Sequence, residues 1–448
     1  MNDFSKMSLA QLTDPRGYDC PCGRHHRTGI EFLSIEAGAV RHLPAALTRL
    51  GVSRPFVVCD PDSKAAAWEP VRAALAGAGL SWTLFCFPES HPEPDERAVG
   101  SLIMAYDPAC DCVLGVGSGV INDCCKMLAH VSRKKQIIVA TAPSMDGYAS
   151  NSSAMIRNRV KLTIYNAPPA AILCDTEIMR KAPMRMLQAG LGDMLAKYIS
   201  VCEWRISHLV TDEYYCENVA GLMRGALRRV AENAEALKNR DEAAVRATAE
   251  GLVISGIASS YAGFSRPASG LEHCFSHMWE MMCLDQGQPI ELHGIQVGIG
   301  TRIVLKLYDR IREIRPDRET AEAFVRGFTD ADWQALVRRI FGRAAETVIA
   351  QEHTVFHKND SAAHAARLER ILSRWDGILE IINEELPPAE PVEELMRKLG
   401  MPMKPEDIGI SRQEAENAFL GSREVRARYM TSSLLWDLGL LYRTELPE

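Results

Sequence analysis

The chain has 448 residues, which is long enough for two domains with a large buried core. Its net charge of −7 excludes a basic face for nucleic acid or for an anionic membrane. No apolar run approaches the length of a membrane span, and the first residues lack a secretory hydrophobic region, so we expect neither membrane nor nucleic acid as a partner. Thirteen cysteines, an odd number, are scattered through apolar segments, which favours reduced thiols and a cytoplasmic protein.

The first part of the chain alternates short β-rich runs with segments of helical periodicity. This alternation predicts a mostly parallel, Rossmann-like sheet with helices on both faces. Strands are expected at 30–38, 55–60, 81–87, 112–117 and 136–140, with helices between them at 39–51, 63–79, 95–108 and 120–133. A hairpin and a last strand are expected within 154–175.

From Met179 onward the periodicity is helical and no convincing strand remains. Long helical stretches are expected at 183–210, 212–237, 241–264, 361–385 and 423–441. The fold class is therefore an α/β domain over residues 1–178 followed by an all-α domain over residues 179–448.

Two of the predicted strands end in residues that suit a nucleotide. Ligands of an open α/β sheet bind beyond the carboxyl ends of its strands. Asp60 follows one strand, where its carboxylate can accept hydrogen bonds from ribose hydroxyls or simply cap the next helix. The segment 115–126 follows another, and Gly115, Gly117 and Gly119 can bring backbone N–H groups to a pyrophosphate at a helix start. A tight strand-to-helix turn is the alternative, since the spacing is not the GxGxxG fingerprint.

A third such segment, 141–155, is unusually rich in serine for a loop that follows a buried strand. Its hydroxyls can hold a nicotinamide ring and phosphates, and Asp146 at its centre can hold substrate hydroxyls. A solvent loop of turn-forming residues is the alternative.

Histidines of the second part have the spacing of metal ligands. His273 and His277 lie four apart, so a helix places them on one face, and His293 opens a second apolar segment. Asp193, on an apolar helix-patterned run, needs a counter-charge if it faces the core. Imidazoles with a carboxylate hold zinc, nickel or ferrous iron. A packed histidine pair is the alternative.

A short amino-terminal span contains Cys20, Cys22, His25 and His26. Thiolates and imidazoles are zinc ligands, but structural zinc usually draws its ligands from two separated pairs. Whether Cys20, Cys22 and His25 bind a second metal therefore stays open.

Five motifs occur together and in order: GSGVIND at 117–123, TAPSMDGYAS at 141–150, GLGD at 190–193, SGLEHCFSH at 269–277 and HGIQVG at 293–298. With them the chain resembles the bacterial branch of the glycerol-1-phosphate dehydrogenases, over nearly its whole length. These group with the iron-containing alcohol dehydrogenases, glycerol dehydrogenase and dehydroquinate synthase. The resemblance implies a dehydroquinate synthase-like fold, with a dinucleotide-binding domain followed by a metal-binding catalytic domain.

The resemblance also assigns roles to individual residues. It implies that Asp193, His273 and His293 bind the metal, whereas the spacing alone also placed His277 among the metal ligands. His277 then lies on the substrate side, and Asp146 and Asp193 act with it as catalytic residues. The implied contacts to the dinucleotide are Gly117, Ser118, Gly119, Val120, Ile121, Thr141, Ala142, Pro143, Ser144 and Ser150, in addition to Asp60.

The implied reaction is the reversible reduction of dihydroxyacetone phosphate to sn-glycerol 1-phosphate, in glycerophospholipid metabolism. The implied cofactors are NAD(H) or NADP(H) and one divalent metal, zinc or nickel with iron as an alternative, which acts as a Lewis acid. The substrate is a small phosphorylated triose or polyol, whose phosphate Lys161 can contact unless it is a solvated strand lysine. A homo-oligomer is expected, with a dimer favoured.

Other functions fit the same fold. A metal-dependent glycerol or polyol dehydrogenase is one alternative, and a dehydroquinate synthase-like lyase is another. The lyase needs several cations near these loops, and we find no such cluster in the sequence. A non-catalytic relative is disfavoured because a buried acid with two imidazoles is costly to keep without a metal.

Overall fold

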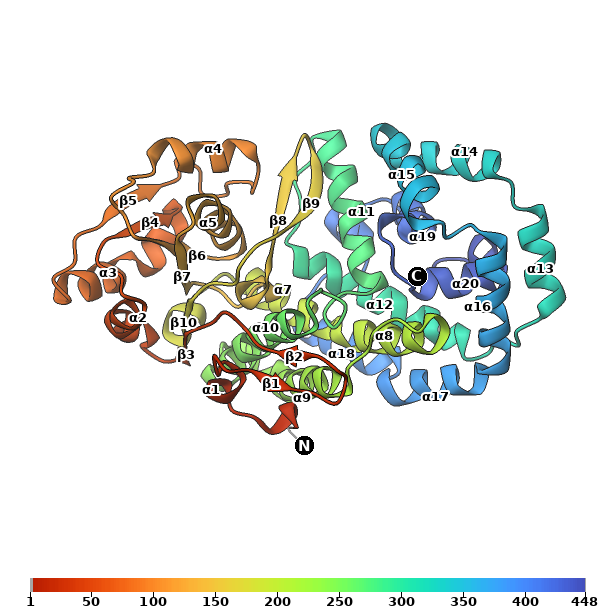
Figure 1. Cartoon of the computed structure of the whole chain (residues 1–448), viewed down its shortest axis with the longest axis horizontal. Coiled ribbons are helices and arrows are strands. Elements are labelled where there is room, and N and C mark those ends of the chain that lie inside the picture. The colour runs from red at the N-terminus through yellow and green to blue at the C-terminus, as the bar shows by residue number, and fades with distance from the viewer. Residues whose placement is uncertain (1–2, 448) are drawn as a thin grey trace. The chain divides into compact units, whose positions relative to one another are not determined.

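The computed structural model describes residues 3–447, and six parallel strands form the sheet of its amino-terminal part (Figure 1). The strand order is β3-β10-β7-β6-β4-β5. The bounds are β3 Phe32–Glu36, β4 Pro55–Cys59, β5 Thr83–Cys86, β6 Cys112–Gly117, β7 Lys135–Ala140 and β10 Ala171–Asp175. Each of these strands lies within or overlaps a segment predicted to be a strand, so the predicted parallel sheet is confirmed.

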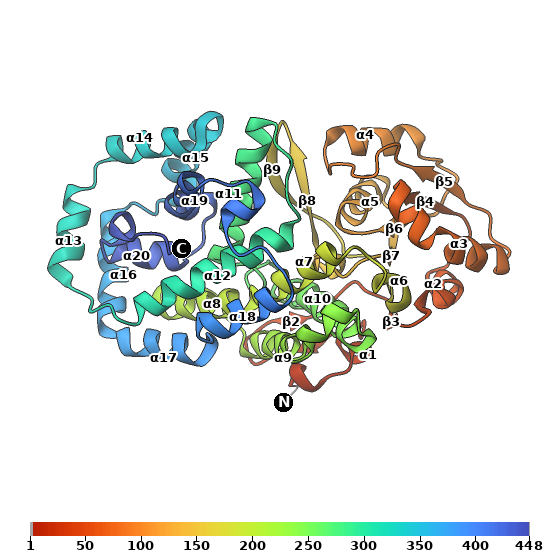
Figure 2. The ribbon, with the colours of Figure 1, turned by 180° about the vertical axis from the view of Figure 1, so that it is seen from behind.

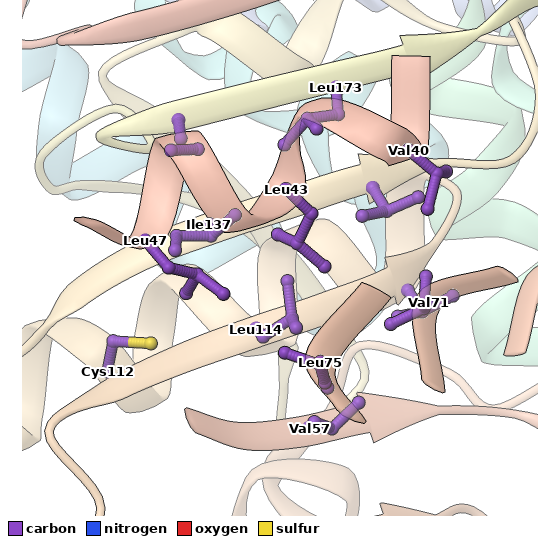
Figure 3. Packing of buried hydrophobic residues seen from close by; sticks show 14 of the residues in the cluster. Val40, Leu43, Leu47, Val57, Val71, Leu75, Cys112, Leu114, Ile137 and Leu173 are labelled. Atoms are coloured by element: carbon purple, nitrogen blue, oxygen red, sulfur yellow. The ribbon is translucent and has the colours of Figure 1, made fainter. Parts of the chain in front are cut away.

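Helices cover both faces of this sheet because successive strand residues point to opposite sides. Val57 packs with α2 (Leu43–Leu50) and α3 (Pro61–Gly77), whereas its neighbours Phe56 and Val58 pack with α4 (Glu96–Ala105) and α5 (Gly119–Ser132). Figure 3 shows the first of these two cores, where Leu43 and Leu47 lie over Leu114 and Ile137. Strands buried on both faces read as nearly continuous apolar runs, as observed.

The sheet has its topological switch point between β4 and β6. These strands are neighbours, yet the helices that follow them, α3 and α5, cover opposite faces. The two connections therefore diverge, and open α/β sheets bind ligands beyond the carboxyl ends of their strands at such a switch point. Asp60 follows β4 and Gly117 ends β6, so both stand at this edge.

A hairpin of β8 (Ser152–Arg157) and β9 (Val160–Tyr165) precedes β10, as predicted, and a short unpredicted pair, β1 (Tyr18–Asp19) and β2 (His25–His26), lies near the amino terminus. Beyond β10 the described chain is helical. The helices not yet named are α1 Leu9–Leu12, α6 Thr176–Met179, α7 Met184–Leu195, α8 Lys197–Thr211, α9 Glu217–Asn233, α10 Glu242–Ala262, α11 Leu271–Gln286, α12 His293–Ile311, α13 Arg318–Gly327, α14 Asp330–Phe341, α15 Ala345–Gln351, α16 Ser361–Ser373, α17 Trp375–Glu385, α18 Ala389–Lys398, α19 Arg412–Val425 and α20 Thr431–Asp437. The predicted fold class is confirmed.

The prediction of one helical stretch over residues 423–441 is wrong, because the structure has two helices there. Helix α19 ends at Val425 and α20 begins at Thr431, with extended backbone at Arg426 and Met430. The buried carboxylate of Glu203 accepts a hydrogen bond from the Thr431 backbone N–H at 2.9 Å, and the Thr431 hydroxyl also donates to it. A distant side chain thus caps the start of α20, and helical periodicity alone does not reveal such a cap.

The chain groups into two compact units. Unit 1 comprises Met1–Lys197, Cys216–Ala268 and Leu292–Ile295, and unit 2 comprises Tyr198–Tyr215, Ser269–Glu291 and Gln296–Glu448. Unit 1 holds the sheet with α9 and α10, and within unit 2 the helix α16 lies beside α13, α17 and α20 (Figure 2). The boundary at 178/179 between independent domains stays a prediction. In the part of the chain that the structure describes, every helix is too short or too polar to span a membrane.

Helix α7 lies against the loop that follows β7, and Gly190 permits this contact. A Cβ at Gly190 would lie 1.8 Å from the carbonyl oxygen of Pro143. We expect Gly190→Ala to destabilise the protein by about 1–3 kcal/mol or more, because backbone must shift to relieve the overlap. Gly221→Ala in α9 is the matched control, since a Cβ there meets no atom within 4 Å. Its stability should stay equal or rise by up to about 1 kcal/mol. Equal thermal midpoints for the two variants would contradict the close contact.

Candidate active site

The first part of the candidate site is the turn from β6 into α5. A Cβ at Gly117 would lie 2.5 Å from Cγ1 of Ile121, so only glycine fits this turn. Ser118 occupies the N-cap without a side-chain cap hydrogen bond, which leaves the first N–H groups of α5 able to bind an anion. The Ser118 and Ser144 hydroxyl oxygens lie 2.7 Å apart, and the Thr141 N–H donates to the Gly117 carbonyl at 3.1 Å. The structure therefore brings the segments 117–121 and 141–144 together.

Asp60 caps α3. Its carboxylate accepts a hydrogen bond from the Ser63 N–H at 2.8 Å, and its own N–H donates to the Ser63 hydroxyl at 3.0 Å. Burial raises the pKa of Asp60, against the opposing effect of the Ser63 hydrogen bonds. The capping alternative is thus observed, and contact with a ribose stays a prediction.

The serine-rich loop is held by a buried lysine, Lys126 on α5. Its Nζ donates to the carbonyl oxygens of Gly147, Ser150 and Ser152 at 2.6, 3.0 and 2.9 Å and to the Ser150 hydroxyl at 3.0 Å. Burial lowers the pKa of Lys126 to about 8, although nearby Asp123 and Asp146 oppose this. Ser150 therefore helps to hold the loop, and its contact with the dinucleotide stays a prediction.

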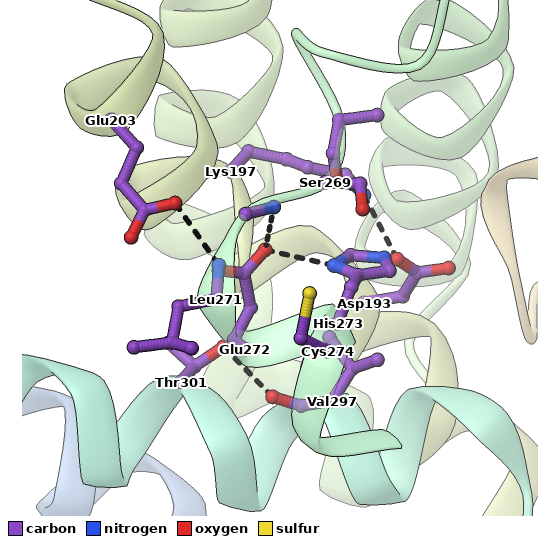
Figure 4. A network of polar contacts seen from close by, with 12 residues as sticks. Asp193, Lys197, Glu203, Ser269, Leu271, Glu272, His273, Cys274, Val297 and Thr301 are labelled. Atoms are coloured by element: carbon purple, nitrogen blue, oxygen red, sulfur yellow. Dashed lines mark hydrogen bonds and ion pairs between the residues drawn. The ribbon is translucent and has the colours of Figure 1, made fainter. Parts of the chain in front are cut away.

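A second buried lysine, Lys197, joins two of the predicted catalytic residues. Its Nζ lies 2.7 Å from Oδ2 of Asp146 and 2.8 Å from Oδ1 of Asp193, and it also donates to the Ala268 carbonyl at 3.0 Å. The Asp146 N–H donates to the other Asp193 oxygen at 2.9 Å, and the Ser255 hydroxyl donates to Asp146 at 2.7 Å. Lys197 and Asp193 are labelled in Figure 4.

Lys197 is charged in this environment. Burial by itself would lower its pKa, but the charges of Asp146 and Asp193 outweigh burial, and the pKa of Lys197 is raised. Both Lys197 and Asp193 are fully buried, and Asp146 is partly exposed. Sequence reasoning missed Lys197, although its position four residues after Asp193 in a helical run places the two on one face.

The start of α12 lies beside α7. A Cβ at Gly294 would lie 1.9 Å from the carbonyl oxygen of Ala189, so glycine permits the contact. Ala189 precedes Asp193 by one helical turn, and Gly294 follows His293 directly. Unit 1 thus brings together the helix that carries Asp193 and the helix end that carries His293.

His273 lies in the first turn of α11 in unit 2, and a carboxylate fixes its ring. Its Nδ1 lies 2.8 Å from Oε1 of Glu272, which is buried and also accepts from the Gly270 N–H at 2.8 Å (Figure 4). Because the carboxylate accepts, the ring proton lies on Nδ1 and Nε2 keeps its lone pair. Metal-binding histidines commonly have this arrangement. Sequence reasoning missed the role of Glu272, although it stands beside His273 in the motif.

His277 also lies in unit 2, one turn after His273. Its Nε2 lies 2.9 Å from Nη2 of Arg426, and its Nδ1 lies 3.5 Å from Oε2 of Glu280. Arginine can only donate, so Nε2 of His277 accepts and the proton lies on Nδ1. The sequence did not reveal Arg426 or Glu280 as partners, and the substrate-side role of His277 stays a prediction.

Lys161, the expected phosphate ligand, lies on β9 opposite Ile156 of β8. It is partly buried in unit 1, near enough to Asp123 to affect the pKa of that carboxyl. Its contact with a substrate phosphate stays a prediction.

The lowered pKa of Lys126 predicts a pH dependence of stability. Between about pH 8 and 10.5 the unfolded chain keeps the lysine proton while the folded chain loses it, so the free energy of unfolding rises with pH in this window. We therefore expect the stability of the wild type, measured relative to Lys126→Met, to rise by up to about 3 kcal/mol as the pH increases across it. Urea unfolding of both proteins at several pH values measures this difference. A difference that is flat or falls with pH would contradict the assignment.

Comparisons with known proteins agree on one family. A family profile described as iron-containing alcohol dehydrogenase matches residues 34–183. A Halalkalibacterium halodurans protein named glycerol-1-phosphate dehydrogenase [NAD(P)+] is 34% identical over 65% of this chain and 74% of its own length. Proteins of the same name from Bacillus velezensis and Methanosarcina acetivorans are 32% and 40% identical, over 79% and 56% of this chain and 91% and 69% of their own lengths.

Solved structures share the fold at lower sequence identity. A probable glycerol dehydrogenase from Sinorhizobium meliloti 1021 is 18% identical with a TM-score of 0.59, over 92% of this chain and 96% of its own. A 1,3-propanediol oxidoreductase is 15% identical with a TM-score of 0.61, over 93% and 97%. The sequence similarity shows the family: the chain belongs to the glycerol-1-phosphate dehydrogenases.

Proposed function

We propose that this protein is a metal-dependent, NAD(P)-linked dehydrogenase that interconverts dihydroxyacetone phosphate and sn-glycerol 1-phosphate. Its relatives carry that enzyme name, with NAD(P)+ as the cofactor. The observation that carries the proposal is the buried set of Asp146, Lys197 and Asp193, which links the loop after β7 to α7. The relatives' names do not favour the lyase or the glycerol dehydrogenase alternatives.

The chemistry of the donor set fits a divalent metal held by Asp193, His273 and His293. A carboxylate with two imidazoles is a catalytic set, because three protein ligands leave a position for substrate. Glu272 already orients His273 so that Nε2 can coordinate. When bound, the metal supplies Lewis-acid polarisation of a carbonyl. We propose zinc or nickel, with iron as the alternative.

The carboxylates of the proposed site suit a cation. The Lys197 ammonium joins Asp146 to Asp193. Carboxylate oxygens are among the ligands that divalent metals take, so this part of the site fits the proposed metal.

We propose the remaining roles one residue at a time. Asp146 is fixed by Lys197 and Ser255, so its partly exposed carboxylate can orient a substrate hydroxyl. His277, oriented by Arg426, is the proposed group that hydrogen-bonds the substrate oxygen or moves its proton. Lys161 is the proposed phosphate contact. The N–H groups that begin α5 are proposed to hold the pyrophosphate of the dinucleotide. The homodimer and the cytoplasmic location stay predictions.

A steady-state assay tests the function. Dihydroxyacetone phosphate, dihydroxyacetone and glycerol are each offered with the appropriate form of NAD or NADP. We expect kcat/KM for the phosphorylated ketone to exceed that for dihydroxyacetone by about 10²-fold or more, because recognition of a phosphate by one charged hydrogen bond is worth about 3 kcal/mol. Equal turnover of the unphosphorylated ketone, or turnover of glycerol alone, would overturn the proposal.

Two histidine variants separate metal binding from substrate contact. His293→Ala should lose the catalytic metal and turnover while its circular dichroism stays unchanged. His277→Ala should keep the metal and bind dinucleotide normally, with kcat lowered by about 10²-fold or more. The metal content and the steady-state kinetics of each variant are measured. Full metal content in His293→Ala would show that His293 is not a metal ligand. Loss of both metal and activity in His277→Ala would show that His277 is a metal ligand.

Asp60 tests cofactor preference. A carboxylate at this position can accept hydrogen bonds from ribose hydroxyls and repels the extra phosphate of NADPH. We therefore expect kcat/KM to be mildly higher with NADH than with NADPH, and we expect Asp60→Ala to reduce this ratio. Asp95→Ala is the matched control, because Asp95 likewise caps a helix, α4, by accepting from the Ala98 N–H at 2.8 Å. Both variants should lose about 1 kcal/mol of stability. If both leave the ratio of kcat/KM for the two cofactors unchanged, Asp60 is only a cap.

A further inference from the structure

The amino-terminal strand pair turns one histidine inward and its neighbour outward. His26 on β2 is fully buried, whereas His25 is exposed, as alternating strand residues require. The His25 ring is held at Nδ1 by Asp19 at 2.8 Å and at Nε2 by the Arg16 carbonyl at 2.9 Å. The sequence left open whether His25 joins Cys20 and Cys22, and in the structure it is His26 that lies beside these two thiols.

A third thiol comes from a distant part of unit 1. Cys216 is buried at the N-cap of α9 and lies 190 residues from His26 in sequence. Its Sγ is 3.6 Å from Sγ of Cys20 and 3.6 Å from Nε2 of His26. The Sγ of Cys22 is 3.2 Å from the same Nε2. One ligand atom from each of the four residues lies within 4.8 Å of all the others.

These distances match the edges of a zinc tetrahedron. With Zn–S of about 2.3 Å and Zn–N of about 2.0 Å, tetrahedral angles place sulfur atoms about 3.8 Å apart and sulfur about 3.5 Å from nitrogen. The distance between the Cys20 and Cys216 sulfur atoms is therefore close to the sulfur–sulfur edge, and the distances from His26 Nε2 to the Cys22 and Cys216 sulfur atoms lie near the sulfur–nitrogen edge. None of the three cysteines forms a disulfide, so their sulfur atoms can serve as ligands.

Neighbouring groups orient the donors toward a common point. The Nδ1 of His26 lies 2.8 Å from the Tyr261 carbonyl oxygen, so the ring proton lies on Nδ1 and Nε2 faces the thiols. The Asn218 side-chain amide donates to Sγ of Cys20 at 3.3 Å. Such secondary contacts are typical of metal ligands.

We propose that Cys20, Cys22, His26 and Cys216 bind one structural zinc ion, separate from the catalytic metal. Three soft thiolates and an imidazole select zinc, and four protein donors close the coordination sphere, so this ion holds structure and does no chemistry. It cross-links residues 20–26 to the start of α9. Because this closes a loop of 190 residues, much of the stabilisation comes from restricting the unfolded chain.

Cobalt spectroscopy on the full chain tests the proposal. Co²⁺ exchanged into the wild type should give thiolate-to-cobalt charge-transfer absorption and tetrahedral d–d bands, because three of the four ligands are sulfur. Cys216→Ser and Cys22→Ser should lose the charge-transfer absorption. His25→Ala, the matched control, should keep it. His293→Ala should also keep it, since the proposed catalytic site contains no thiolate, so failure of one site is distinguishable from failure of the other.

Metal content gives a second, independent measurement. His293→Ala as isolated should retain about one equivalent of zinc, and His293→Ala with Cys216→Ser should retain none. Titrating the thiols of the folded wild type with a mercurial should release zinc to a colorimetric chelator, which needs no variant to fold. Absence of charge-transfer absorption in the wild type, its persistence in Cys216→Ser, or a Cys20–Cys216 disulfide in non-reduced peptides would overturn the proposal.

Discussion

The buried ammonium of Lys197 is the constraint on which the proposed catalytic chemistry depends. The Lys197 Nζ lies within hydrogen-bond distance of both Asp146 and Asp193, and a cation between two neighbouring carboxylates offsets their mutual repulsion. Lys197 thereby holds the loop after β7 against α7. The contacts of Lys197 with Asp146 and Asp193 therefore fix the position of Asp146, the residue proposed to contact the substrate.

Close backbone contacts make this arrangement possible. Gly190 lets α7 approach the Pro143 carbonyl, and Gly294 lets the start of α12 approach the Ala189 carbonyl. Glycine is needed at both positions because any Cβ would overlap backbone, which cannot move aside as a flexible side chain can. The motifs GLGD and HGIQVG therefore combine a proposed metal ligand with the glycine that brings its helix into place.

Buried cations and oriented imidazoles recur through the structure. Lys126 holds the serine-rich loop through carbonyl oxygens, and Glu272 fixes the ring of His273. In each case one side chain fixes the position of a second group, and the second group is the one proposed to bind cofactor or metal. His26 follows the same principle, since the Tyr261 carbonyl turns its free nitrogen toward three thiols.

The sequence by itself determined the alternating α/β region, the helical remainder and the motif positions of Asp146, Asp193, His273 and His293, because periodicity and glycine spacing are local properties. Only the tertiary structure decided the partners: Lys197 with Asp146, Arg426 with His277, and Cys216 with His26 in place of His25. It also decided that 423–441 breaks before Thr431, where Glu203 supplies the cap. These contacts join residues far apart in the chain, and packing selects them from many candidates of the same chemistry. The local sequence around each residue therefore does not predict which distant residue becomes its partner.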